Sequence, residues 1–150
     1  MVKLKENQLV ISAFPATGKT YYCCNGDWSH YMPPNFATDS DSSNFDKSNF
    51  PSNYIEHIKH LIELGVHRIF VSSHKEVRDA LVENGIDFVL VYPKSELKDE
   101  FIDRYKKRGS ADEFINLVSK NWDLLMEQLK QQKGCKHIEL DSGQYLSNVI

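Results

Sequence analysis

The feature that most constrains the fold of this chain is an eight-residue stretch, A-F-P-A-T-G-K-T, which begins at the last residue of the apolar run from Leu9 to Ala13. It is one glycine short of the phosphate-binding loop pattern G-x-x-x-x-G-K-[ST], because its first position is alanine. Such a loop joins a buried strand to the start of a helix, where successive backbone N–H groups converge on phosphate oxygens. Alanine is the mildest replacement for that glycine, so we expect the loop to form.

The pattern gives each loop residue an expected role. Lys19 would reach the β- and γ-phosphates of a nucleotide, and the hydroxyl of Thr20 would ligate Mg²⁺. The other positions of the expected cradle are Ala13, Pro15, Ala16, Thr17 and Gly18. The alternative is a strand, an ordinary turn containing Pro15 and a helix with an exposed Lys-Thr pair. The strand-loop-helix context of the motif favours the phosphate loop.

Length and composition indicate a small enzyme. A chain of 150 residues is expected to form one domain with a single two- or three-layer core. A net charge of −3 provides no long-range attraction to nucleic acid or to an anionic membrane. No apolar run approaches the ~18 residues of a membrane span, and the N-terminus lacks the apolar region of a signal peptide. We therefore expect a cytoplasmic protein, monomeric or a small homo-oligomer, with no nucleic-acid or membrane partner.

Strands alternate with helices along the chain, which predicts an α/β fold with a parallel sheet covered on both faces. Strands are expected at 9–13, 66–72, 86–92 and 137–140, with a short, weak one at 36–38. Helices are expected at 19–24, 54–64, 73–85, 96–107, 111–132 and 144–150. Two of these helices have a predicted capping box, Ser73 with Glu76 and Ser110 with Glu113.

Acidic and hydroxyl residues follow the weak second strand. Ligands of parallel sheets lie at the carboxyl ends of the strands, so the sequence D-S-D-S-S is expected near the phosphate loop. Asp39 and Asp41 suit the water ligands of Mg²⁺, or the orientation of an acceptor hydroxyl or phosphate, and Ser42 lies beside them. The alternative is a solvated turn. No aspartate ends the next strand, which makes Asp39 and Asp41 the expected acidic partners of the metal.

Basic residues supply the remaining candidates. His74 is expected to line the site, and Arg78 to bind a phosphate bidentately, the alternative for Arg78 being a surface ion pair. Arg104 and Arg108 are spaced i, i+4 and therefore project from one helical face. Phosphoryl transfer needs cations over the migrating group, which a closing lid can supply. Basic residues that favour the last turn of a helix are the alternative for this pair.

The segments A-F-P-A-T-G-K-T, D-S-D-S-S, V-S-S-H-K-E-V-R and R-Y-K-K-R-G together resemble small phosphate-loop kinases of the nucleoside monophosphate kinase type, most of all the short versions encoded by bacteriophages and their hosts. The resemblance implies a three-layer P-loop NTPase fold, with a five-stranded parallel sheet in the order 2-3-1-4-5. Within a single domain, 1–150, it implies an acceptor region at about 39–64 and a small helical lid at about 94–112. It places Arg78 near the acceptor phosphate.

The expected function is ATP-dependent phosphoryl transfer to a nucleotide, a nucleoside or deoxynucleoside monophosphate, with ATP and Mg²⁺ as cofactors. The expected catalytic residues are Lys19, Asp39, Asp41, Arg104 and Arg108, and the expected metal ligands are Thr20, Asp39 and Asp41. One alternative is a small-metabolite or nucleoside kinase, in which an aspartate acts as base toward a hydroxyl. Another is a regulatory module that binds a nucleoside triphosphate and transfers nothing. The usual acceptor signature after the third strand is missing, which leaves the acceptor open.

Overall fold

A five-stranded parallel sheet forms the centre of the protein. The computed structural model describes residues 3–6, 8–18, 37–39 and 46–150, and for residues 37–39 and 147 it describes only the backbone. The strand order is β2-β3-β1-β4-β5, and every pairing is parallel. The strands are β1 (Leu9–Ala13), β2 (Ala37–Asp39), β3 (Arg68–Ser72), β4 (Val89–Pro93) and β5 (Lys136–Leu140). The expected α/β class with a parallel sheet is confirmed, and the observed order is the one that the resemblance implied.

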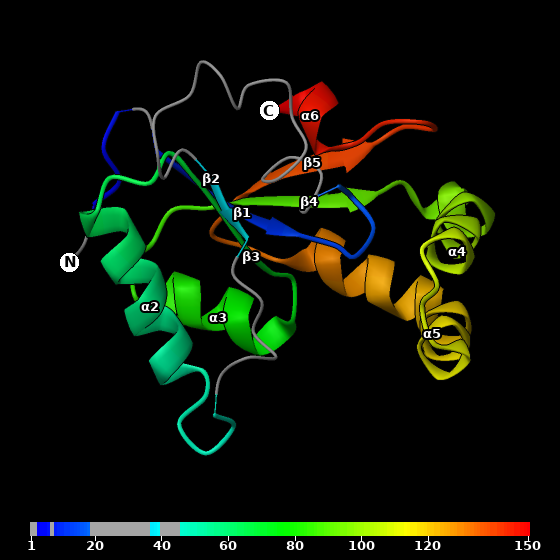
Figure 1. The fold of residues 1–150 in the computed structure, drawn as a ribbon, viewed down its shortest axis with the longest axis horizontal. Helices are drawn as coiled ribbons and strands as arrows, with labels where there is room; N and C mark the ends of the chain where they lie inside the picture. The colour runs from blue at the N-terminus through cyan, green and yellow to red at the C-terminus, as the bar shows by residue number, and fades with distance from the viewer. Residues whose placement is uncertain (1–2, 7, 19–36, 40–45) are drawn as a thin grey trace.

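Helices lie on both sides of this sheet. They are α2 (Ser52–Glu63), α3 (Lys75–Glu83), the 3₁₀ helix η3 (Ser95–Leu97), α4 (Lys98–Lys107), α5 (Asp112–Gln131) and α6 (Leu146–Val149). Figure 1 shows α2, α3 and α5 along one face, α6 on the opposite side, and α4 beyond the carboxyl ends of β1 and β4. The helix expected at 19–24 lies outside the described residues. Within the described part of the chain, no helix combines the length and the apolar character that crossing a bilayer requires.

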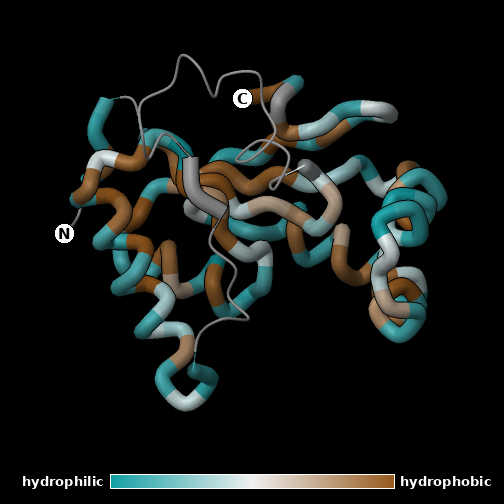
Figure 2. The backbone as a smooth tube through the Cα atoms, in the orientation of Figure 1, coloured by the Kyte–Doolittle hydropathy of each residue, from teal (hydrophilic) through white to brown (hydrophobic). Residues whose placement is uncertain are grey.

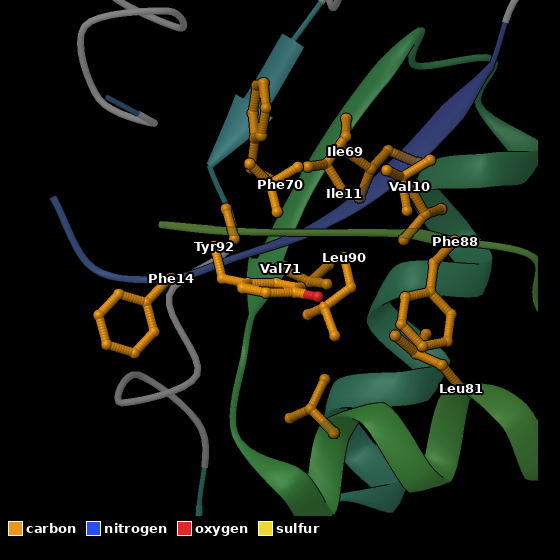
Figure 3. Packing of buried hydrophobic residues seen from close by; sticks show 14 of the residues in the cluster. Val10, Ile11, Phe14, Ile69, Phe70, Val71, Leu81, Phe88, Leu90 and Tyr92 are labelled. Atoms are coloured by element: carbon orange, nitrogen blue, oxygen red, sulfur yellow. The ribbon is translucent and has the colours of Figure 1, made fainter. Parts of the chain in front are cut away.

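The central strands are buried because their apolar runs meet cover on both faces. Val10 and Ile11 of β1, Val71 of β3 and Leu90 of β4 are fully buried. The hydropathy colouring in Figure 2 shows this apolar centre, with polar residues concentrated on the outer turns and helix surfaces. In Figure 3, the side chains of Val71 and Leu90 point toward the helical layer in which Leu81 of α3 lies. The sheet core thus holds the carboxyl ends of β1, β3 and β4 in fixed positions.

Two helix starts differ from the sequence prediction. The residue that precedes α3 is His74, and the residue that precedes α5 is Ala111; neither helix has a side-chain cap hydrogen bond. Ser73 and Ser110 are therefore one residue too early to cap, and the two predicted capping boxes were wrong. A capping box needs its serine at the residue directly before the first helical turn, because only there does the hydroxyl reach the N–H of the third helical residue.

An aromatic cluster joins the end of β1 to the helices beyond it. The ring of Phe14 meets the ring of Trp122 of α5 edge-on, with centroids 5.8 Å apart, and lies 6.3 Å from Phe101 of α4. The indole N–H of Trp122 donates to the carbonyl oxygen of Ser95 at 2.8 Å, which ties η3 to α5. Phe14 directly follows β1, so this cluster fixes the point from which the predicted phosphate loop leaves the sheet.

Candidate functional site

The predicted loop, residues 13–18, leaves the sheet at its centre. Ala13, the last residue of β1, is fully buried and pairs with Ser72 of β3 and Val91 of β4. The N–H of Phe14 extends the pairing by donating to the carbonyl oxygen of Val91 at 2.9 Å. The carboxyl edge of an open α/β sheet, where the chain crosses from one side to the other, is the usual place for a ligand. The loop therefore occupies the position that a binding site in this fold requires.

The carbonyls of Phe14 and Pro15 accept hydrogen bonds from protein side chains. The hydroxyl of Thr17, which is fully buried, donates to the carbonyl oxygen of Phe14 at 2.8 Å. The hydroxyl of Tyr105 of α4 lies 3.3 Å from the carbonyl oxygen of Pro15 and donates to it. Burial raises the pKa of Tyr105 well above its usual range, so this hydroxyl keeps its proton. The carbonyl of Pro15 is thus held toward α4, and the carbonyl of Phe14 is bonded within the loop.

The next two carbonyls are bonded from α4 and α6. Arg104 donates from Nη1 to the carbonyl oxygen of Ala16 at 3.0 Å. The backbone N–H of Leu146, the first residue of α6, donates to the carbonyl oxygen of Thr17 at 2.9 Å. Every carbonyl from Phe14 to Thr17 therefore has a donor within the protein.

The N–H groups of the same peptides point the other way. In a planar trans peptide, the carbonyl of one residue and the N–H of the next lie on opposite sides, so the N–H groups of Ala16, Thr17 and Gly18 face away from α4 and α6. None of the three has an acceptor among the described residues. Ala16 and Gly18 have φ angles of 66° and 99°, in the left-handed region, with Thr17 between them. A run of free N–H groups across left-handed residues is the geometry of an anion-binding concavity.

Gly18 suits this position because of its backbone angle, and because its lack of a side chain leaves room for Tyr145. A Cβ atom at this position would lie 3.2 Å from Cδ1 and 3.4 Å from Cβ of Tyr145. The ring of Tyr145 thus packs directly on the glycine of the motif. The packing of Phe14 therefore fixes the beginning of the loop, next to β1. Tyr145, in the segment after β5, packs against its end.

The lid prediction required Arg104 to project over the N–H side of the loop. Instead, Arg104 lies on the carbonyl side. Its side chain is 10% exposed and its guanidinium carbon lies 4.0 Å from the ring centroid of Tyr145 and 4.3 Å from that of Phe101. Its Nη2 donates to the carbonyl oxygen of Gln144 at 2.9 Å and contacts Glu100 at 3.3 Å. These bonds, with the one to Ala16, engage both terminal nitrogens of the guanidinium within the protein. The predicted contact of Arg104 with substrate is not supported.

The rest of the expected lid, 94–112, is part of the core. Phe101 and Tyr105 of α4 are fully buried, and lifting α4 would expose both, at about 1.5–3 kcal/mol for each side chain. Arg108 is exposed at the end of α4 and donates from Nε to the hydroxyl of Ser110 at 2.8 Å. Of the two predicted lid arginines, only Arg108 has its charge at the surface. The packing of α4 thus gives any lid movement a cost, and the lid stays a prediction.

Arg78 also differs from its predicted role near an acceptor phosphate. Its side chain is 4% exposed, and its Nε donates to the carbonyl oxygen of Ser73 at 2.8 Å. Its Nη1 donates to Oε1 of Gln132 at 2.9 Å, so it joins the start of α3 to the residue after α5. Burial lowers the pKa of Arg78. His74, by contrast, is exposed at the start of α3. We interpret Arg78 as a structural residue.

The expected metal and acceptor residues are described only in part. Asp39 is the last residue of β2, opposite Phe70, and so belongs to the strand that was expected to end before it. Its side chain, and the whole of Lys19, Thr20, Asp41 and Ser42, lie outside the described residues, so their roles stay predictions. Among the side chains that the structure does describe, no three His, Cys, Asp or Glu residues come together as a metal site.

Sequence reasoning missed that residues 141–146, which we call the C-terminal turn, pack against the carbonyl side of the loop. Glu100 of α4 holds this turn by accepting hydrogen bonds from the hydroxyl of Ser142 at 2.5 Å and the N–H of Gly143 at 3.2 Å. The bond from Ser142 is the main cause that lowers the pKa of Glu100, with smaller contributions from Gly143 and from the charge of Arg104. Only the polar D-S-G-Q sequence marks this turn, and it carries no sign of contact with a loop so distant along the chain.

Comparisons with known proteins identify no related protein. No protein-family model matches the chain, and neither the curated proteins nor the solved structures contain a match to it. The assignment of a function therefore depends on the geometry of the loop and on the motif that it carries.

Proposed function

We propose that this chain is a P-loop NTPase-type protein that binds ATP with Mg²⁺ at the loop 13–18 and transfers the terminal phosphoryl group to a nucleotide. The observation that carries the proposal is the orientation of the loop peptides. Their carbonyls are bonded to α4, α6 and Thr17, whereas the N–H groups of Ala16, Thr17 and Gly18 face away from these partners.

This arrangement suits a phosphate group chemically. An anion needs donors that are already oriented, because reorienting a backbone after binding would reduce the affinity. The loop meets this need, since its left-handed angles at Ala16 and Gly18 are held by packing against Tyr145 and by the hydrogen bond from Arg104. The residue after Gly18 is Lys19, whose ammonium group would neutralise charge on the terminal phosphates. When bound, ATP would supply the phosphoryl group, and the protein would supply position and charge.

A second candidate, a module that binds a nucleoside triphosphate without transferring a phosphoryl group, is favoured by the positions of two arginines. Arg78 is buried between α3 and α5, and Arg104 lies under the loop. Both were expected to contact phosphates during transfer. With these two residues engaged elsewhere, transfer depends on Lys19, on Arg108 and on the acidic residues Asp39 and Asp41.

Both candidates are tested by one set of assays on the wild type, on Lys19→Ala and on Lys3→Ala as a control for loss of a lysine at an exposed position away from the motif. ATP affinity is measured by calorimetry, and ADP formation is followed with a panel of nucleoside monophosphates and nucleosides. We expect the wild type to bind ATP and to turn over with a monophosphate. Lys19→Ala should reduce kcat by about 100- to 1000-fold, the loss typical of one donor that stabilises transition-state charge, with an unchanged melting temperature.

The outcomes separate the candidates. Turnover of Lys19→Ala at the wild-type rate would contradict the phosphate-loop interpretation. Tight ATP binding with no ADP formed from any acceptor would favour the binding module. Turnover with nucleosides and not with monophosphates would indicate a nucleoside kinase.

A further inference from the structure

The hydrogen bond from Arg104 to the loop has a consequence for the other side of the same peptide. We propose that Arg104 is a positioning residue that strengthens anion binding through the peptide group between Ala16 and Thr17, and that the C-terminal turn holds it in place for this purpose. The inference rests on the proposed function, because it concerns how the loop binds phosphate.

The first step of the argument is the chemistry of the peptide. A guanidinium that donates to a carbonyl oxygen makes a charge-assisted hydrogen bond and draws electron density toward that oxygen. Hydrogen-bonded groups in a chain polarise one another, so the N–H at the far side of the peptide becomes a stronger donor. Arg104 donates to Ala16 at 3.0 Å, and the N–H of that peptide belongs to Thr17. The effect of the arginine is therefore directed at the concave side of the loop.

The second step is geometric. Ala16 has a φ of 66°, which costs an alanine conformational energy, and it needs partners that hold the angle. The bond from Arg104 fixes the carbonyl of Ala16, and the bond from Leu146 fixes the next carbonyl along the chain. Arg104 thus fixes the direction of the Thr17 N–H before any ligand arrives.

The third step concerns how Arg104 itself is held. Its guanidinium lies against the rings of Tyr145 and Phe101 and donates to the carbonyl oxygen of Gln144. Glu100 contacts the same guanidinium at 3.3 Å and offsets its charge. Because Glu100 offsets this charge, Arg104 acts on the loop mainly through its hydrogen bond to Ala16 and only weakly through its long-range electrostatic field. Removing a positive charge elsewhere on α4 should therefore not reproduce the effect of removing Arg104.

The test compares four proteins: the wild type, Arg104→Met, Arg104→Lys and the control Lys106→Met, which removes an exposed positive charge from the same helix. Calorimetry measures the affinity for ATP and for inorganic tripolyphosphate, which has no base or sugar, at a temperature below every melting transition. We expect Arg104→Met to weaken binding of both ligands about 10- to 100-fold, the range that loss of an outer-shell hydrogen-bond partner costs at metal sites. Arg104→Lys should be intermediate, and Lys106→Met should stay within about twofold of the wild type, because exposed charges interact weakly through solvent.

Each result decides the matter. If the wild type binds both ligands and Arg104→Met binds them as tightly, Arg104 has only a structural role and the inference is overturned while the proposed function stands. If the wild type binds neither, the proposed function fails, and the inference fails with it. If Arg104→Met does not fold, Arg104→Lys replaces it, since this variant keeps the positive charge but loses the planar guanidinium that donates to Ala16 and Gln144. A several-fold weaker affinity of Arg104→Lys than of the wild type supports the inference, and an unchanged affinity overturns it.

Discussion

The left-handed angle at Ala16 allows the shape of the loop to be tested without any ligand. An alanine at a φ of 66° costs roughly 1–2 kcal/mol relative to the right-handed regions, a penalty that glycine does not have. Against this, glycine gives the unfolded chain more freedom, which destabilises the native state by about 0.4–1 kcal/mol. The methyl group of Ala16 is partly buried against the core, and its loss costs about half of the ~0.8 kcal/mol assigned to a fully buried methylene. We therefore expect Ala16→Gly to stabilise the protein by about 0.5 kcal/mol.

The matched control is Ala80→Gly in α3. Ala80 is 6% exposed and helical, so glycine there loses about 1 kcal/mol of helix propensity and ~0.8 kcal/mol of methyl burial. Ala16→Gly should thus raise the free energy of unfolding and Ala80→Gly should lower it, so that the two variants differ from each other by about 2 kcal/mol. Urea unfolding followed by circular dichroism measures this difference through the midpoints, provided that the slopes agree.

The reasoning would be refuted if Ala16→Gly destabilised the protein as much as Ala80→Gly. That result would mean that the backbone at Ala16 has an ordinary negative φ. The N–H groups of the loop would then not face away from α4 and α6 as described.

Two further predictions concern residues around the site. Arg78→Met should lower the free energy of unfolding by about 1–3 kcal/mol, because it leaves buried acceptors without a donor. The affinity for ATP, measured by calorimetry, should stay within about twofold of the wild type. A large loss of this affinity with unchanged stability would instead place Arg78 in the ligand site. Glu100 has a pKa lowered in the folded state, chiefly by Ser142, so its contribution to stability is present above its unfolded pKa and is lost as pH falls through the lowered value. The stability gap between the wild type and Glu100→Gln, measured by urea unfolding, should therefore narrow as the pH falls below the unfolded pKa of about 4.3, and a gap that does not change with pH would contradict this account.

Local sequence patterns were sufficient to predict most of the fold. The run from Leu9 to Ala13 gave β1 with its observed bounds, because a short apolar segment that stops at a turn has few other uses in a small domain. The apolar spacing around Trp122 likewise predicted the long helix α5 to within one residue at each end. Strand order could not be derived from such patterns. It was available only through the resemblance.

The site was harder to predict, because helical spacing says which residues share a face but not where the face points. Arg104 and Arg108 are i, i+4 as expected. The burial of Phe101 and Tyr105, however, orients α4 so that Arg104 contacts the carbonyl side of the loop. Arg78 was misplaced for the same reason, since its position on α3 faces Gln132. The contact of Tyr145 with Gly18 joins opposite ends of the chain, and no local signal predicts such a contact.

The central position of β1 also bears on how this protein acquires its site. β1 is made first during synthesis, but its partners on both sides, β3 and β4, come from the middle of the chain. Such non-local pairings slow folding, because a long stretch of chain loses conformational entropy before the stabilising contacts form. The loop is completed later still, when Leu146 and Tyr145 reach it. A loop assembled this way exists only in the finished fold, so a ligand that bound it would stabilise the whole native state against unfolding, and not the loop alone.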